Sequence, residues 1–93
     1  SAEYALHTGY PNLFNPSITL PFDLPEGTLL SLVVYDLMGR EVARLVDRDL
    51  TAGYHQAIWN GRDKAGREVP TGIYIARMVT PEYSKAIRMA LLK

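Results

Sequence analysis

Apolar and polar residues alternate along most of this chain, a pattern typical of β-strands with one buried face. The alternation over 18–24 predicts one strand, and that over 30–34 predicts a second after the turn sequence LPEG. The same period predicts further strands over 55–59, 74–78 and 87–91.

Two segments are less regular. Val42, Leu45 and Val46 predict a short strand that ends at the polar sequence DRDLTAG. A helix over LMGREVARLVDRDL is the alternative, but this segment has no N-cap residue and its glycine falls early, so we favour the strand. A strand over 4–8, before the proline-bracketed YPNLFNP, would be the seventh. Six or seven short strands, about 8–12 residues apart with turn signals between them, indicate an all-β protein with an antiparallel β-sandwich.

A seven-residue pattern occurs twice. DLMGREV and DKAGREV share Asp, Gly, Arg, Glu and Val in the same register. An Asp at the first position of a type I turn accepts hydrogen bonds from the N–H groups after it, and a Gly three residues later accepts a positive φ. We therefore predict two equivalent turns, at Asp36 with Gly39 and at Asp63 with Gly66. Other structural turn residues are expected at Asn60, Gly61 and Gly72.

The polar connection NGRDKAGREVPTG also invites ligand-binding interpretations. Its glycines are spaced as in a phosphate-binding loop, but Arg67 and Glu68 stand where that loop needs Lys and then Ser or Thr, and a carboxylate there would repel phosphate. A calcium loop needs several acidic residues at alternate positions, and Asn60, Asp63 and Glu68 are too sparse for it. The favoured interpretation is a long hairpin connection that binds no ligand.

Length and charge narrow the function classes. A chain of 93 residues makes one domain, and ten Lys plus Arg balance ten Asp plus Glu. Without a net positive field, nucleic acid is not an expected partner. The chain has no cysteine, so disulfides and thiolate metal sites are excluded. It shows neither a membrane-length apolar run nor a signal peptide, so for an exported protein we expect the signal on a longer parent.

No set of residues suggests catalysis. The histidines are His7 and His55, and neither has further metal ligands at a recognisable spacing. His55 alternates with Ala57 and Trp59, so we expect it to pack or hydrogen-bond at the edge of the core. Ser17 and the other serines lack a nucleophile context. We expect no catalytic, cofactor-binding or metal-binding residues, and no enzyme activity in this domain.

The aromatic residues leave one binding alternative open. Tyr35, Tyr54, Tyr74 and Tyr83 with Trp59 would suffice for a saccharide or peptide platform, although a small sandwich usually places its Trp in the core.

Several phrases of the chain resemble a known family. They are YPNLFNPSITLPFDLP, VVYDLMGREVARLVD, AGYHQAIWNGRDKAGREVPTGIYIARM and the final KAIRMALLK. In this order they resemble the type A C-terminal sorting domain of the bacterial type IX (Por) secretion system. The central block is also similar to the Ig-like domain of the flagellar hook-capping protein. These resemblances imply an Ig-like sandwich of about seven strands over 10–93, with 1–9 as a linker or a first strand.

Departures from the sorting-domain pattern are few. Leu13 replaces a Pro, Ile18 replaces a Thr, and Asn60 replaces the Asp that comes after the Trp. None of them removes a turn glycine or the last strand.

The resemblance implies a non-catalytic sorting and attachment module of a larger exported protein. Its partners would be the outer-membrane translocon, a sortase-like peptidase and a parent catalytic or adhesive domain. Its location would be the cell surface, the outer membrane or the medium. The expected recognition segment is the last strand, with the candidates Lys85, Arg88, Leu91, Leu92 and Lys93. The last strand either has an open edge for β-augmentation or is paired on both sides.

A second candidate surface is the outward face that bears Val33, Tyr35, Ile73 and Ile75. Two other roles stay open for the module as a whole. It would be a constitutive cell-attachment module, or a carbohydrate-binding accessory of a glycoside hydrolase or adhesin with a cell-surface polysaccharide as its partner.

Overall fold

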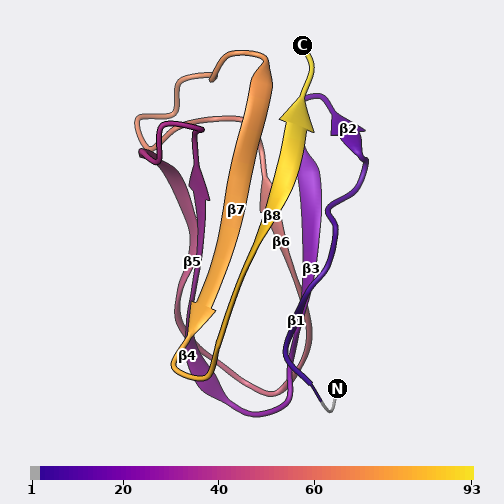
Figure 1. The fold of residues 1–93 in the computed structure, drawn as a ribbon, viewed down its shortest axis with the longest axis vertical. Helices are drawn as coiled ribbons and strands as arrows, with labels where there is room; N and C mark the ends of the chain where they lie inside the picture. The colour runs from indigo at the N-terminus through magenta and orange to yellow at the C-terminus, as the bar shows by residue number, and fades with distance from the viewer. Residues whose placement is uncertain (1–2) are drawn as a thin grey trace.

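The computed structural model describes residues 3–93 and consists of strands and loops (Figure 1). Two sheets pack face to face, which confirms the predicted all-β, Ig-like sandwich. The strands are β1 (Ala5–Leu6), β2 (Leu13–Phe14), β3 (Ile18–Leu24), β4 (Thr28–Tyr35), β5 (Glu41–Leu50), β6 (Gly53–Trp59), β7 (Gly72–Thr80) and β8 (Tyr83–Leu91).

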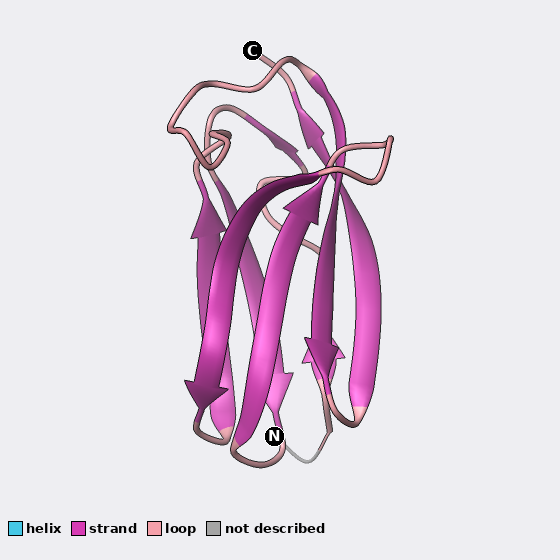
Figure 2. Cartoon of the chain, turned by 90° about the vertical axis from the view of Figure 1, so that its left-hand side faces the viewer, coloured by secondary structure: helices cyan, strands magenta, loops and turns pink. Residues whose placement is uncertain are grey.

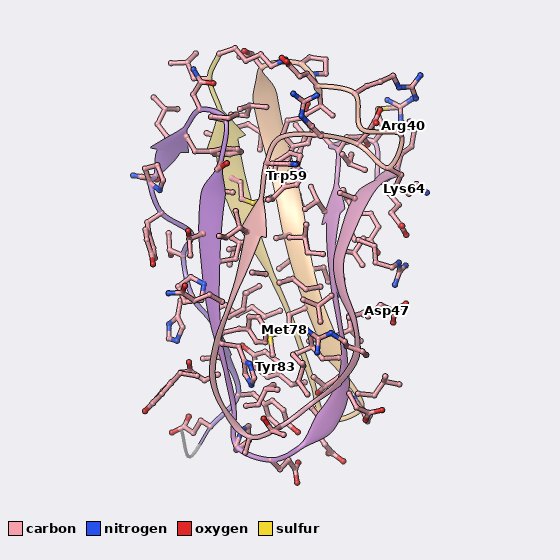
Figure 3. The ribbon with its side chains drawn as sticks, turned by 180° about the vertical axis from the view of Figure 1, so that it is seen from behind. Arg40, Asp47, Trp59, Lys64, Met78 and Tyr83 are labelled. Carbon is pink, nitrogen blue, oxygen red and sulfur yellow. The ribbon has the colours of Figure 1, made fainter. Side chains whose placement is uncertain are left out.

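Alternation along the strands builds the core. In β3, every second residue from Ile18 to Leu24 is buried. Trp59 at the end of β6 is 1% exposed, and its ring lies 5.6 Å from that of Phe14 and 5.1 Å from that of Tyr74. Figure 3 shows Trp59 and Met78 between the two sheets. The Trp59 side chain is therefore part of the core, as expected for a small sandwich.

The strand order is β1-β3-β6 in one sheet and β2-β8-β7-β4-β5 in the other. All pairs are antiparallel except β2 with β8, where Leu13 and Phe14 lie opposite Ala90 and Leu91. The segment before β3 therefore contributes β1 to one sheet and β2 to the other. The expected strand over 4–8 is present only as the two residues of β1, and β2 was not expected.

The segment after the first repeat differs from its prediction. β5 has ten residues and ends at Leu50, so the short strand was wrong in length and the helix alternative was wrong. β5 pairs on one side with β4 and lies at the edge of its sheet. Asp47, Arg48 and Asp49 are exposed there, and charged residues are a common means of keeping an edge strand from pairing with other chains.

A tyrosine ties the start of β7 to the connection before it. The Tyr74 hydroxyl donates to the carbonyl of Pro70 at 2.6 Å, the arrangement known as a tyrosine corner in Ig-like folds. Burial, followed by the charge of Asp36, raises the pKa of the Tyr74 phenol. Gly72 is the first residue of β7 and has no positive φ, so its prediction as a turn residue was wrong.

Candidate functional surfaces

The two repeats fold into matching turns. Asp36 Oδ1 accepts hydrogen bonds from the N–H groups of Met38 and Arg40 at 2.9 and 3.0 Å. The Gly39 N–H donates to the Asp36 carbonyl at 3.0 Å, and Gly39 has a φ of 83°. The local sequence therefore builds a type I turn followed by a left-handed glycine.

The second copy repeats these contacts. Asp63 Oδ1 accepts from the N–H groups of Ala65 and Arg67, both at 2.9 Å. The Gly66 N–H donates to the Asp63 carbonyl at 2.9 Å, and Gly66 has a φ of 80°. Figure 2 shows these connections at the end of the sandwich where the chain reaches its last residue.

Hydrogen bonding to the ionised carboxylate lowers the pKa of both turn aspartates. For Asp36 the largest cause is the Arg40 N–H, and for Asp63 it is the Arg67 N–H. Burial acts in the opposite direction on both groups but is outweighed. Both carboxylates are thus committed to holding the backbone.

The remainder of the polar connection is held in the same way. Asn60 Oδ1 accepts from the Arg62 N–H at 3.1 Å, and the Gly61 carbonyl accepts from the Val69 N–H at 3.0 Å. Gly61 has a φ of 74°. The Trp59 indole N–H donates to the Arg62 carbonyl at 3.0 Å. Across residues 3–93, no group of three His, Asp or Glu side chains could hold a metal ion.

The predicted recognition residues of the last strand do not form one surface. Leu91 is 2% exposed and belongs to the core, so it was wrong as a contact residue for a partner of the folded domain. Arg88 is exposed and lies opposite Ile75, on the outer face of the five-stranded sheet. Lys85 is also exposed but lies opposite the buried Met78, on the side of β8 that faces the other sheet.

Leu92 and Lys93 are hydrogen-bonded to β2 and to the loop before β7. The Leu92 N–H donates to the Phe14 carbonyl at 3.0 Å, and the Lys93 N–H donates to Thr71 Oγ1 at 3.1 Å. The Lys93 ammonium lies 3.1 Å from Glu68 Oε1. This hydrogen bond, followed by the charge of Lys93, lowers the pKa of Glu68.

A cavity of about 340 Å³ adjoins Lys93. Lys93, Glu68 and Arg62 line it together with residues of the loops before β3 and after β6. It is therefore a polar recess at the end of β8, built from three parts of the sequence.

β8 is paired on both sides only at its end. β7 pairs with it from Tyr83 to Leu91, while β2 pairs with it at Ala90 and Leu91 alone. Within the described residues, no strand pairs with the second edge of β8 before Ala90. Near its start, Tyr83 stacks on Tyr4 with ring centroids 5.4 Å apart. The last strand thus combines both expected arrangements, with a long open edge and a short closed one.

The outward apolar face predicted as the second surface is covered in part. Val33 is 2% exposed, and its neighbours in register are Arg44 and Arg77. Tyr35 and Ile75 are partly exposed and line a depression of about 330 Å³ beside Leu37. Ile73 is partly exposed as well, so the covered part of this face is the part around Val33.

His55 lies at the edge of the core, which confirms its expected role. Its ring stacks on Phe22 at 5.3 Å, and its Nε2 lies 2.8 Å from the Thr51 carbonyl.

Comparison with known protein families identifies the family of this domain. The family model of the FlgD Ig-like domain matches residues 16–82, well over half of the chain. The chain therefore belongs to the FlgD Ig-like domain family. A comparison with curated protein sequences finds no match.

Solved structures share the fold. PorZ is described as an essential bacterial surface component of the type IX secretion system of Porphyromonas gingivalis. It matches 96% of this chain with a TM-score of 0.66 and 23% identity. Dimeric latent PorU of the same organism matches 96% of the chain with a TM-score of 0.72 and 20% identity. The alkylpurine DNA glycosylase AlkC of Pseudomonas fluorescens matches 100% with a TM-score of 0.58 and 18% identity. This chain spans 12%, 9% and 31% of these proteins.

The described residues contain no helix that is long and apolar enough to span a membrane.

Proposed function

We propose that this domain is a non-catalytic sorting module that directs a larger exported protein through the type IX secretion system to the cell surface. One observation carries the proposal: the sorting-domain phrases run in order from YPNLFNP to KAIRMALLK on an Ig-like sandwich. The fold likeness to a domain-sized part of PorZ supports it. Partners on this proposal are the outer-membrane translocon, a sortase-like peptidase and the parent domain.

The proposed recognition site is the end of β8. Leu92 is half exposed, and Lys93 is held beside Glu68 at the rim of the polar recess. Because the last residues are tied to β2 at Phe14 and to the loop at Thr71, a receptor that binds them would bind only the folded domain. Recognition of a folded surface would explain why a whole sandwich serves as the signal.

A localisation assay tests the proposal. The 93-residue chain is fused behind a periplasm-directed fluorescent protein and expressed in a host with type IX secretion and in its translocon-deficient mutant. We expect fluorescence at the surface or in the medium only in the competent host. Fluorescence that stays in the periplasm of both strains would reject the sorting role.

Point variants then test the recognition site more cleanly than a truncation from Ala90, which would remove the buried Leu91 and damage the core. We expect export to fall in a Leu92→Ala, Lys93→Ala double variant that melts like the original domain. Lys64→Ala is the matched control, because Lys64 is an exposed cation at the same end of the sandwich but outside the recess. Equal export of all three proteins would move recognition away from the last residues.

The reporter's mass gives a further readout. Loss of the domain from the surface-exposed reporter indicates processing by a peptidase. Retention of the domain would instead support a constitutive attachment module.

A further inference from the structure

We propose that the outer face of the three-stranded sheet binds a neutral polysaccharide, independently of any sorting role. We call this surface the tyrosine face. It is made of Tyr10, Pro21, Asp23, Tyr54, Gln56 and Ile58.

Strand register brings these residues together. The buried alternate residues of β3 and β6 leave Thr19, Asp23 and their cross-strand partners Ile58 and Tyr54 pointing outward. Tyr10 bridges to Thr19 from the loop before β2. Thr19 and Asp23 are four residues apart on one strand, so the two tyrosine positions are separated by about 13 Å along the sheet. A short stretch of a sugar chain would reach from one ring to the other.

The side chains of the tyrosine face are unusually open to solvent. Tyr54 is 78% exposed, Ile58 63% and Tyr10 51%. Of the other aromatic residues considered for a saccharide platform, Trp59 and Tyr74 are buried, Tyr83 stacks on Tyr4, and Tyr35 is only partly exposed on the other sheet. A cluster of exposed large apolar side chains on a sheet marks an interaction surface. The flat rings also match the apolar C–H faces of pyranoses.

Polar groups lie beside the rings and are held in place. The Gln56 amide donates to the Tyr10 hydroxyl at 3.3 Å, and the Asp23 carboxylate lies 3.0 Å from His7 Nε2. An open depression of about 750 Å³ includes Asp23, Gln56 and Tyr54 in its lining. Amide and carboxylate groups can each make two hydrogen bonds to neighbouring sugar hydroxyls. Rings flanking such groups suit an oligosaccharide better than a purely apolar partner.

The charge of the tyrosine face favours a neutral polysaccharide over an acidic one. All ten Lys and Arg residues lie outside 3–39 and 49–61, the two ranges that contain every strand of this sheet. The tyrosine face therefore has no cation of its own to attract an acidic polysaccharide, a nucleic acid or an anionic membrane. Binding through rings, amides and one carboxylate should depend little on salt.

Affinity gel electrophoresis of the 93-residue chain tests the proposal. The gels contain soluble hydroxyethylcellulose, arabinoxylan or mixed-linkage β-glucan as separate probes. We expect at least one polymer to retard the protein, and we expect the dissociation constant to rise about tenfold or more in Tyr54→Ala and in Tyr10→Ala. Retardation should survive an increase in salt from about 0.05 to 0.5 M, since the Debye length changes but no ion pair is involved.

Two controls keep the test decisive. Tyr54→Phe retains the ring and should keep most of the binding. Met38→Ala removes a side chain that is 79% exposed but lies in the first turn, outside the tyrosine face, and should bind as the original does. Thermal melting of every variant checks that the substitutions leave the fold intact.

Several outcomes would overturn the proposal. They are no retardation by any of the three polymers, retardation of both Ala variants equal to that of the original domain, or loss of binding in salt. A concentration-dependent dimer that Tyr54→Ala abolishes in sedimentation experiments would assign the face to a second copy of the chain instead. Sorting is measured separately by the localisation assay, so the two proposals can fail independently.

Discussion

The turns at Asp36–Gly39 and Asp63–Gly66 have the same hydrogen bonds but lead into different structures. The first continues into the ten residues of β5, whereas the second continues into one isolated bridge between Arg62 and Glu68. Five shared residue types are enough to fix the turn, because every contact that defines it lies within five consecutive residues. The structure after each turn depends on the next residues, which are ARLVD after the first copy and PTG after the second.

Proline explains the short second continuation. Pro70 has no N–H to donate to a strand ladder and its φ is fixed, so the segment after Val69 cannot extend a strand as β5 does. In addition to its own hydrogen bonds, the second turn is flanked by two contacts from other parts of the chain. The Trp59 indole binds the Arg62 carbonyl, and the Tyr74 hydroxyl binds the Pro70 carbonyl. The comparison predicts that local changes affect both turns equally, while changes to these anchors affect only the second.

The largest effect should come from Gly61→Ala, which changes only the polar connection that contains the second turn. Gly61 combines a φ of 74° with a backbone oxygen of Pro16 only 3.0 Å from where a Cβ would lie. We expect a loss of about 2–4 kcal/mol in the free energy of unfolding, measured by urea denaturation. Gly27→Ala is the control, because its new Cβ would meet only ordinary contacts. A loss no greater than that of Gly66→Ala would contradict the close contact with Pro16.

Gly39→Ala and Gly66→Ala should be smaller and equal to each other. Both glycines have a φ near 80°, and both would place the added methyl group in open space. The cost is then the left-handed backbone alone, about 1–2 kcal/mol for each variant in the same denaturation assay. Clearly unequal losses would show that the two turns themselves differ, and not only the segments after them.

Tyr74→Phe should separate the two turns. The substitution keeps the ring against Trp59 but removes the hydrogen bond to Pro70. We expect a loss of about 1 kcal/mol, together with faster amide hydrogen exchange around the second turn and unchanged exchange around the first. Tyr54→Phe, at an exposed position, is the control. Equal acceleration at both turns would argue against the anchor.

The smallest effect is a pH dependence shared by both turns. The pKa values of Asp36 and Asp63 are lowered in the folded domain, so their stabilising contribution is complete above the unfolded value of about 3.9 and is lost as pH falls through the folded values. An Asp36→Asn, Asp63→Asn double variant should lose less stability on acidification. Thermal melts between about pH 2 and pH 6 would check this. Parallel curves for the two proteins would contradict the assigned cause.

Much of the fold could be predicted because it depends on local patterns. The period-two alternation located β3, β4, β6, β7 and β8, and the Asp and Gly spacing located the paired turns. β2 was missed because two residues between prolines carry no readable period, and its parallel partner lies at the other end of the sequence. The length of β5 was missed because its exposed edge carries the charges Asp47, Arg48 and Asp49, which read as a loop.

The candidate surfaces were harder to predict because exposure depends on neighbouring strands. Leu91 and Leu92 are adjacent and chemically alike, yet one fills the core and the other is half exposed. Val33 faces outward but is covered beside two arginines. The tyrosine face needs the register between β3 and β6, which no single segment encodes. The tyrosine corner depends on the contact of the Tyr74 hydroxyl with the Pro70 carbonyl, which the period-two alternation does not reveal.

The parallel pairing of β2 with β8 has a consequence for the order in which the domain can form. When the chain is delivered N-terminal end first, by a ribosome or through a pore, Phe14 has no strand partner until Ala90 and Leu91 have emerged. The five-stranded sheet and its share of the core therefore close last, at the moment when the final residues become available. The sandwich is therefore complete only after β8 has been delivered.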